Sequence, residues 1–345
     1  MSNNQIVDKE IEKFFFINEL IENNTPSELP MYLYHYTSVY GFQSILSLNM
    51  SNESNVVLWA SRYDCLNDMT EGLLINNIYK EACNELLSDN LIDLQQYNAI
   101  IGLKQNNSVF VYYENDDNAV YEDSAYTKEI INGNGKCYCL EGDRFICCFS
   151  ENNDSLPMWN YYTKDNKYEG YNIEFDVTNL EEYLKTLYGK GIKYELYKVI
   201  YNTNKQKDLI KDFVSKLLEK YYSDDIEFVK NTISEQLFEW SLIFKNKCFE
   251  HEKEVRLILS IPKKLPKDVN TEQYYIIKHR FNHGLVIPYI ELPVKKMCVS
   301  GVTIGPLLCD NNEKVEQKRI LGNLLESYGF KLNDNVNYSE IPVRY

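Results

Sequence analysis

Three groups of polar side chains, far apart in the sequence, have types and spacings that could do chemistry. The first comprises His35, Tyr36, Thr37 and Ser38, at the end of a strand predicted over 31–36. An imidazole can donate and accept hydrogen bonds and hydroxyls add adaptable partners, so this group could hold a hydroxylated ligand. The alternative is structural: His35 satisfies a buried backbone group, and Thr37 or Ser38 caps the helix that follows. For this group alone we prefer the structural alternative.

The second group surrounds Ser150, which follows the continuous apolar run 145–149. Such a run predicts a strand buried on both faces, and ligand-facing polar residues often lie where a buried strand meets a loop. A short helix is predicted to start at Pro157, and three of its aromatic side chains could wall a pocket: Trp159, Tyr161 and Tyr162. The alternative gives Ser150 a turn role and packs Met158 and Trp159 in the core. For Met158 we favour the core.

The third group is charged and runs from Glu252 to Arg256. On a strand, side chains alternate with period two, so Glu252, Glu254 and Arg256 would share one face while 255, 257 and 259 are buried on the other. Two carboxylates on one face repel, which would raise the pKa of one of them, and Arg256 could offset that effect. The charged face lines either solvent, as weak surface ion pairs, or a cleft, and the pattern favours neither.

The elements that position these groups alternate irregularly along the chain. Apolar periodicity predicts helices near 6–24, 40–48, 69–88, 91–104, 209–221, 225–247 and 313–328, and strands near 31–36, 56–60, 108–113, 145–149, 171–175, 196–201, 255–260 and 302–304, with a hairpin at 273–292. Because strict βαβ alternation is missing, we expect an α+β fold with a mixed, largely antiparallel sheet and helical insertions. The expected organisation is an N-terminal helix (1–30), one α+β domain (31–330) with a helical insertion near 205–248, and a C-terminal tail (331–345).

Composition limits the classes of function. The formal charge of −15 opposes non-specific binding to nucleic acid, which depends on neutralising phosphates. The nine cysteines are odd in number and several lie in apolar runs, which predicts reduced, buried thiols in a reducing compartment. The N-terminus shows no signal-peptide pattern and no apolar stretch approaches the ~20 residues of a membrane span. We therefore expect a cytoplasmic protein without a membrane segment.

Several common motifs are missing from the sequence. There is no P-loop, no dinucleotide-binding fingerprint and no Gly-x-Ser-x-Gly turn, which argues against common NTPases, Rossmann enzymes and hydrolases. The segment His251-Glu252-Lys253-Glu254-Val255 resembles a zinc-protease motif only in part, because its fifth position is not histidine. The sequence therefore predicts no metal site.

The three groups and their neighbours resemble a widespread bacterial family of unknown function. The resemblance spans roughly residues 31–330 and rests on an ordered set of short motifs: Leu-Trp-x-Ser at 58–61, Asn-Asp-x-x-Glu at 67–71, Cys-Phe-Ser-Glu at 148–151, Met-Trp-x-x-Tyr at 158–162, Gly-x-x-x-Glu-Phe at 170–175, Glu-x-Glu-x-Arg at 252–256, Pro-Tyr-Ile-Glu-Leu at 288–292 and Ile-Gly-Pro at 304–306.

The order of the groups also resembles the signature of the ADP-ribosyltransferase superfamily. That signature has an Arg or His on an early strand, a Ser or Tyr on a middle strand and a late Glu, often the second acid of a Gln/Glu-x-Glu pair. The resemblance implies that His35 holds the ADP-ribose part of NAD through its ribose hydroxyls, that Ser150 supports the acid, that Glu254 is catalytic and that Glu252 positions the acceptor. The middle motif reads Phe-Ser-Glu here, where the superfamily has Ser-Thr-Ser.

The same resemblance extends to the fold and to further contacts with the ligand. It implies an ADP-ribosyltransferase-like sheet, and it makes Tyr161 or Tyr162 a candidate to stack on nicotinamide. Further candidate binding residues are Tyr36, Thr37, Trp159 and Arg256. The implied reaction uses NAD as a substrate, needs no metal, and takes an acceptor that is a protein, a nucleic acid or a small molecule.

Three functions follow from these patterns. The first is an NAD-dependent ADP-ribosyltransferase-like protein, by analogy a toxin or an anti-phage defence effector. Cleavage of the nicotinamide bond builds positive charge on the ribose, which a carboxylate can stabilise. The second is a non-catalytic nucleotide-binding or regulatory module. The third is a metal-dependent hydrolase or nuclease that uses Glu252 and Glu254.

Overall fold

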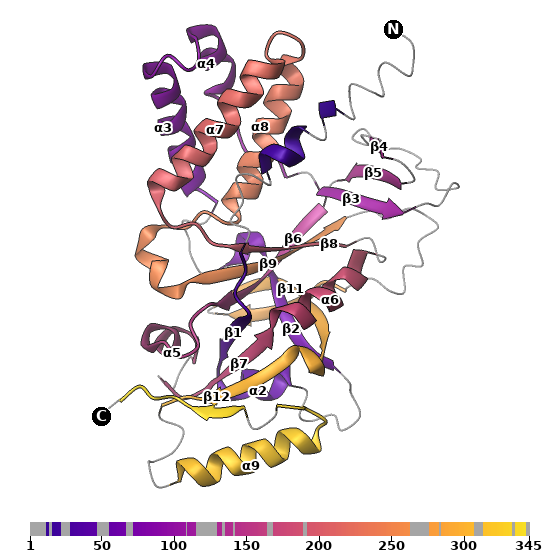
Figure 1. Cartoon of the computed structure of the whole chain (residues 1–345), viewed down its shortest axis with the longest axis vertical. Coiled ribbons are helices and arrows are strands. Elements are labelled where there is room, and N and C mark those ends of the chain that lie inside the picture. Colours follow the sequence, from indigo (N-terminus) through magenta and orange to yellow (C-terminus); the bar gives the residue numbers. More distant parts are fainter. Residues whose placement is uncertain are drawn as a thin grey trace.

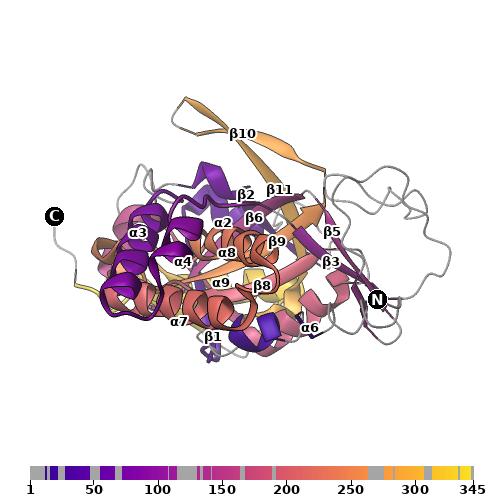
Figure 2. The same cartoon turned by 90° about the horizontal axis from the view of Figure 1, so that it is seen from above.

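The fold is a large sheet with helices on both of its faces (Figures 1 and 2). It is described here from a computed structural model. The residues that the structure describes are 12–13, 16–21, 28–46, 55–66, 72–107, 109–114, 130–132, 135–140, 142–163, 168–188, 192–262, 276–282, 284–306, 313–332 and 335–342, with the backbone alone for those between 109 and 140.

The main sheet has ten described strands and is mixed but mostly antiparallel. Eight lie side by side in the order β10 (Lys278–Asn282), β11 (Leu285–Lys295), β2 (Asn55–Arg62), β6 (Gly142–Ser150), β1 (Tyr32–Thr37), β7 (Tyr171–Asp176), β12 (Val299–Ile304) and β13 (Val336–Tyr338), while β9 (Glu254–Pro262) pairs with β6 and with β8 (Lys193–Lys198). The expected α+β class with a mixed, largely antiparallel sheet is therefore confirmed.

Strand β6 is the centre of this sheet. Along one edge it pairs with β9 over its whole length, from Gly142 opposite Pro262 to Ser150 opposite Glu254. Along the other edge it meets two strands, β2 at its Phe145–Ile146 end and β1 only at Ser150. In these registers β1 and β2 part from each other between Ile146 and Ser150, so the sheet splits at this edge of β6.

Two hydrophobic cores lie on the two faces of the sheet. Successive strand residues point to opposite faces, and in β6 Ile146 packs in one core while Cys147 packs in the other. The first core is covered by α3 (Leu74–Ser88), α4 (Leu94–Ile100), α7 (Thr203–Tyr221) and α8 (Ile226–Ser241); elements at the second include α2 (Val39–Ile45), α6 (Val177–Tyr188) and α9 (Lys314–Ser327). Figure 1 shows α3, α4, α7 and α8 gathered at the end opposite α9.

Most predicted elements are found within a few residues of their expected bounds, and the differences are instructive. The predicted insertion near 205–248 holds α7 and α8, but α8 ends at Ser241 rather than near 247. Residues 336–338, expected in a tail, pair in parallel with β12 as strand β13. Helix α6 and a separate three-stranded sheet of β3 (Val109–Glu114), β5 (Gly135–Leu140) and β4 (Ile130–Asn132) were not fully predicted.

The predicted N-terminal helix is described only in part. Residues 12–13 and 16–21 are helical, and the rest of 1–27 lies outside the described residues. Leu20 is buried in the core formed by the helices. Among the described helices, none has the length and apolar character needed to cross a membrane.

Candidate functional site

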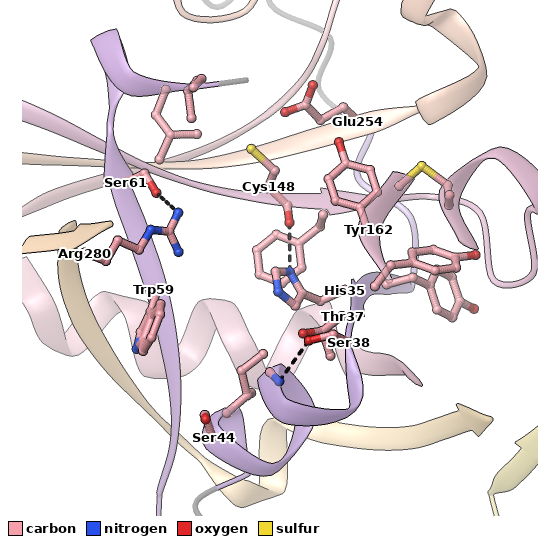
Figure 3. A pocket seen from close by; sticks show the side chains of 18 of the residues that line it. His35, Thr37, Ser38, Ser44, Trp59, Ser61, Cys148, Tyr162, Glu254 and Arg280 are labelled. Atoms are coloured by element: carbon pink, nitrogen blue, oxygen red, sulfur yellow. Dashed lines mark hydrogen bonds between the residues drawn. The ribbon is translucent and has the colours of Figure 1, made fainter. Parts of the chain in front are cut away.

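A pocket of about 540 Å³ lies at the split edge of β6 (Figure 3). Its volume falls within the ~300–1,000 Å³ typical of small-molecule sites. The residues that line it come from β1, α2, β2 and the 3₁₀ turn after it, β6, the helix α5 (Leu156–Tyr162), the 3₁₀ helix before β9, the start of β9, and β10. They are Tyr34, His35, Tyr36, Thr37, Ser38, Tyr40, Gly41, Ser44, Ile45, Trp59, Ser61, Cys65, Leu66, Ile146, Cys148, Phe149, Met158, Tyr162, Glu252, Glu254, Arg280 and Phe281.

His35 lines the pocket and also completes the sheet at the split. Its Nδ1 lies 3.0 Å from the carbonyl oxygen of Cys148, between the two points where β6 meets β2 and β1. Burial lowers the pKa of His35, which the backbone bond to Cys148 only partly opposes. A carbonyl oxygen can only accept, so in the neutral ring Nδ1 carries the proton and Nε2 is left as an acceptor. The structural alternative for His35 is confirmed, and the same ring faces the pocket.

The hydroxyl groups next to His35 divide between capping and the pocket. Ser38 is the N-cap of α2, and its Oγ accepts from the backbone N–H of Gly41 at 3.2 Å. Tyr36 donates to the carbonyl oxygen of Asn152 at 2.8 Å and accepts from the N–H of Ser155 at 3.1 Å. These bonds fix the loop after β6, so Tyr36 shapes the pocket by holding its wall.

A buried charge cluster forms the opposite end of the pocket. Glu254 begins β9, and its two oxygens accept from Arg256 at 2.8 Å (Nε to Oε1) and 3.1 Å (Nη2 to Oε2). The ammonium of Lys245 donates to Oε2 of Glu254 at 2.9 Å and to Oε2 of Glu252 at 2.7 Å. All four side chains are buried, so two carboxylates and two cations balance each other away from water.

Glu252 does not lie on the strand, contrary to the expected shared strand face. It ends the 3₁₀ helix η2 (Lys247–Glu252), and Lys253 follows in the left-handed conformation with φ 43°. Ser150, fully buried, donates its hydroxyl to the carbonyl oxygen of Glu252 at 2.6 Å and accepts from the N–H of Asn152 at 3.0 Å. Ser150 thus ties the end of β6 to the turn that brings Glu252 beside Glu254.

The expected raised pKa is not found at Glu254. Burial alone would raise the pKa of this carboxyl, but Arg256 and then Lys245 outweigh it and lower the pKa to about 2. Burial would likewise lower the pKa of Lys245, yet Glu254 and Glu252 raise it overall despite opposition from Arg256. Both groups therefore stay ionised at neutral pH. The offset expected from Arg256 is the larger of the two effects, and Lys245, which the sequence argument omitted, adds to it.

The cluster turns its negative side to the pocket. Glu252 and Glu254 line the pocket, whereas Lys245 and Arg256 do not. The cations lie behind the carboxylates, and Arg256 also donates to the carbonyl oxygen of Leu242 at 2.6 Å. This arrangement can stabilise positive charge on a ligand without any change in protonation.

The pocket brings together six of the ten candidate residues: His35, Tyr36, Thr37, Tyr162, Glu252 and Glu254. Ser150, Trp159, Tyr161 and Arg256 do not line it. Trp159 is fully buried, packs edge-on against Tyr36 at 4.8 Å and donates to Asp154, in agreement with the core alternative. Tyr161 is 54% exposed and lies against His251. Only one aromatic of α5 that was predicted to wall a pocket, Tyr162, does so.

Other lining residues were not singled out from the sequence. Arg280 reaches the pocket from β10 and donates to the hydroxyl of Ser61 on β2 at 2.9 Å. Trp59 lies beside it, within the Leu-Trp-x-Ser motif that had served only as a family marker. No sequence pattern around Arg280 marks it as a site residue. Its contacts depend on strand pairing, because β11 pairs with β2 and β10 pairs with β11.

The surroundings of Glu252 and Glu254 disfavour both a reactive thiol and a metal site in the pocket. Burial, followed by the charge of Glu254, raises the pKa of Cys148 well above its usual value, so its thiol is a poor nucleophile at neutral pH. Lys245 already bridges the two carboxylates. Among the described residues, no three His, Cys, Asp or Glu side chains are grouped so that they could hold a metal ion.

Comparison with known proteins gives one family. No curated protein and no solved structure matches the chain. A family model described as "Protein of unknown function (DUF2971)" matches residues 158–257. This segment runs from α5 into β9 and contains Tyr162, Lys245 and both carboxylates of the pocket. Over residues 158–257, less than a third of its length, the chain is similar to this family of unknown function.

Proposed function

We propose that the protein cleaves NAD in this pocket and transfers the ADP-ribosyl group to an acceptor. The observation that carries the proposal is the position of two acidic side chains, Glu252 and Glu254, which line the pocket with their cations behind them. NAD carries a positively charged nicotinamide ring, and its cleavage leaves positive charge on the ribose. A pocket with a fixed negative end would attract the nicotinamide ring and stabilise the positive charge on the ribose.

The proposed reaction breaks the bond between the ribose C1′ and the nicotinamide nitrogen. The electron pair of that bond leaves with nicotinamide, which becomes neutral, and the ribose carries the positive charge. An oxygen or nitrogen of the acceptor then bonds to C1′ and loses its proton to solvent. Water as the acceptor would give ADP-ribose. The charge that develops is that of a glycoside hydrolysis transition state.

Four of the pocket residues have a role in this proposal. Glu254, with its pKa lowered to about 2, stabilises the charged ribose as a permanent anion rather than as a base. Glu252 beside it orients the acceptor. Nε2 of the neutral His35 accepts a hydrogen bond from a ribose hydroxyl. The ring of Tyr162 offers a surface for nicotinamide.

One alternative is favoured by a specific observation. Both oxygens of Glu254 already accept bonds from cations, and this arrangement also suits a module that binds a nucleotide without turning it over. A carboxylate has about four acceptor sites, so a ribose hydroxyl can still bind. The hydrolase or nuclease alternative needs a divalent cation between Glu252 and Glu254, and Lys245 occupies that position.

The test measures nicotinamide release and label transfer from ADP-ribose-labelled NAD, with bacterial lysate as the source of acceptor. Wild-type protein should release nicotinamide, and Glu254→Gln should reduce the rate by about 100-fold or more, the usual effect of removing one electrostatic contact to a transition state. Glu316→Gln, which changes an exposed ion pair with Arg319, is the matched control and should behave as wild type.

Two further readouts keep the outcome decisive. Melting curves show whether Glu254→Gln is folded, and Glu252→Gln should lose transfer to the acceptor more than release of nicotinamide. Wild-type protein that binds NAD but releases no nicotinamide supports the non-catalytic alternative. A folded Glu254→Gln variant that is as active as wild type would also overturn the proposal. If the activity is found, a toxin or anti-phage effector acting in the cytoplasm is the biological role we infer.

A further inference from the structure

Arg280 lines the pocket and is a cation without a counter-ion among the residues that the structure describes. It lies on β10, where the β10–β11 hairpin extends from the body of the protein (Figure 2). Its guanidinium is half-buried and lines the pocket, and its Nη2 donates to the Ser61 hydroxyl at 2.9 Å. Among the described residues it forms no ion pair, and its buried Nε has no hydrogen-bond partner.

Two aromatic rings hold the guanidinium in place. Its central carbon lies 5.5 Å from the ring centre of Trp59 and 5.8 Å from that of Tyr289, both on strands that continue the sheet. Rings at these distances attract a cation and limit its rotamers. Arg280 is therefore held in position with a buried N–H donor unused, and no carboxylate in the described part of the chain neutralises it.

A half-buried, unpaired charge is costly, and natural proteins usually pair such a group or use it for binding. The planar guanidinium fork fits the two oxygens of a phosphate or carboxylate. Figure 3 places Arg280 with Ser61 and Trp59 on one side of the pocket, and Glu254 with Tyr162 on the other. The pocket thus has a positive end and a negative end.

We propose that Arg280 is an anion-binding residue that fixes a phosphate group of the ligand at the hairpin end of the pocket. A ligand with a phosphate at one end and a hydroxylated or cationic group at the other fits this polarity, as a nucleoside diphosphate or dinucleotide does. The phosphate assignment rests on Arg280 and its surroundings, and only its application to the pyrophosphate of NAD rests on the proposed function.

Binding is measured by calorimetry with ADP, inorganic pyrophosphate and adenosine. Wild-type protein should bind ADP more tightly than adenosine, and added salt should weaken binding of pyrophosphate. Arg280→Gln should weaken ADP binding on the order of ten- to a hundred-fold, as expected for loss of hydrogen bonds to a charged group, and leave adenosine unchanged. Arg280→Lys should fall between, because it keeps the charge but loses the fork.

Lys278→Gln is the matched control. It removes one positive charge from the same strand two residues away, where Lys278 pairs with Glu291 outside the pocket, and should change ADP affinity by less than about twofold. A melting curve for Arg280→Gln checks its fold. The proposal is overturned if wild-type protein binds ADP no better than adenosine, or if Arg280→Gln leaves ADP affinity unchanged or weakens both ligands alike.

The two proposals can fail separately. If ADP binding depends on Arg280 but no nicotinamide is released, the proposed phosphate subsite stands and the proposed transferase activity is refuted. If nicotinamide is released and the KM for NAD is the same in Arg280→Gln as in wild type, the proposed transferase activity stands and the proposed phosphate subsite is refuted.

Discussion

The substitution Glu254→Gln tests the buried charge cluster through its effect on stability. Glutamine keeps the shape of the side chain and removes its charge, so the carboxylate that accepts two bonds from Arg256 and one from Lys245 is lost. In the folded protein the pKa of Glu254 is about 2, against an ordinary value of 4.5. At 1.36 kcal/mol per unit, the ionised form contributes about 3 kcal/mol at neutral pH.

The magnitude converts into a measurable shift of the melting temperature. Unfolding entropy of about 2.1 cal/mol/K per residue gives roughly 0.7 kcal/mol/K for the 345-residue chain. A loss of about 3 kcal/mol should therefore lower Tm by ~4 °C at pH 7. Differential scanning calorimetry of wild type and Glu254→Gln measures this shift directly.

The pH dependence has a defined sign. Because the folded pKa of Glu254 is depressed, its contribution is complete above the unfolded value of 4.5 and is lost as pH falls through the folded value of about 2. The difference between variant and wild type should fall to about 1 kcal/mol at pH 3. An equal or higher Tm for Glu254→Gln at pH 7, or a difference that is the same at pH 3, would refute the reasoning. Glu316→Gln on the surface should show neither effect.

Two further predictions concern the packing of Gly170 and the hydrogen bonds of Asp154. Gly170→Ala should destabilise the protein by about 1–3 kcal/mol, because the added methyl group would meet the backbone oxygen of Thr37. At Gly102 the methyl group has free space, so Gly102→Ala should be neutral or slightly stabilising. Thermal melting of the two variants compares these effects. Asp154→Ala should free the C-terminal segment, because its carboxylate accepts from the Ser339 hydroxyl and from the next backbone N–H. Hydrogen exchange should then rise at 336–341 and stay unchanged in α7, and equal protection in both proteins would contradict this contact.

Local patterns predicted much of the fold because they depend on residues that are close in sequence. The apolar run 145–149 is the buried centre of the sheet, and helix α7 buries the face on which its apolar residues recur. Helix α6 was not predicted, although Val177, Leu180 and Leu184 recur at helical spacing. Strand β13 has three residues, too few for any periodicity, and exists because β12 offers it an edge.

The aromatic residues of α5 show that residue type alone does not predict which side chains line the pocket. Trp159, Tyr161 and Tyr162 lie within one turn or so of α5, and neighbouring positions on a helix point about 100° apart. The sequence marked the aromatic cluster, but only the packing of α5 decided that Tyr162 faces the pocket while Trp159 enters the core. The Asn-Asp-x-x-Glu motif at 67–71 lies outside the described residues.

The sequence by itself determined which side chains could do chemistry and that Glu254 and Arg256 share a strand face. It could not determine their charge environment, because Lys245 reaches both carboxylates from the loop after α8. Nor could it place His35 against Cys148, 113 residues away, or Arg280 against Ser61, 219 residues away. Those contacts follow from strand register, which is set by packing across the whole sheet. The tertiary structure therefore decided that the separate groups form one pocket, with Arg280 opposite Glu254.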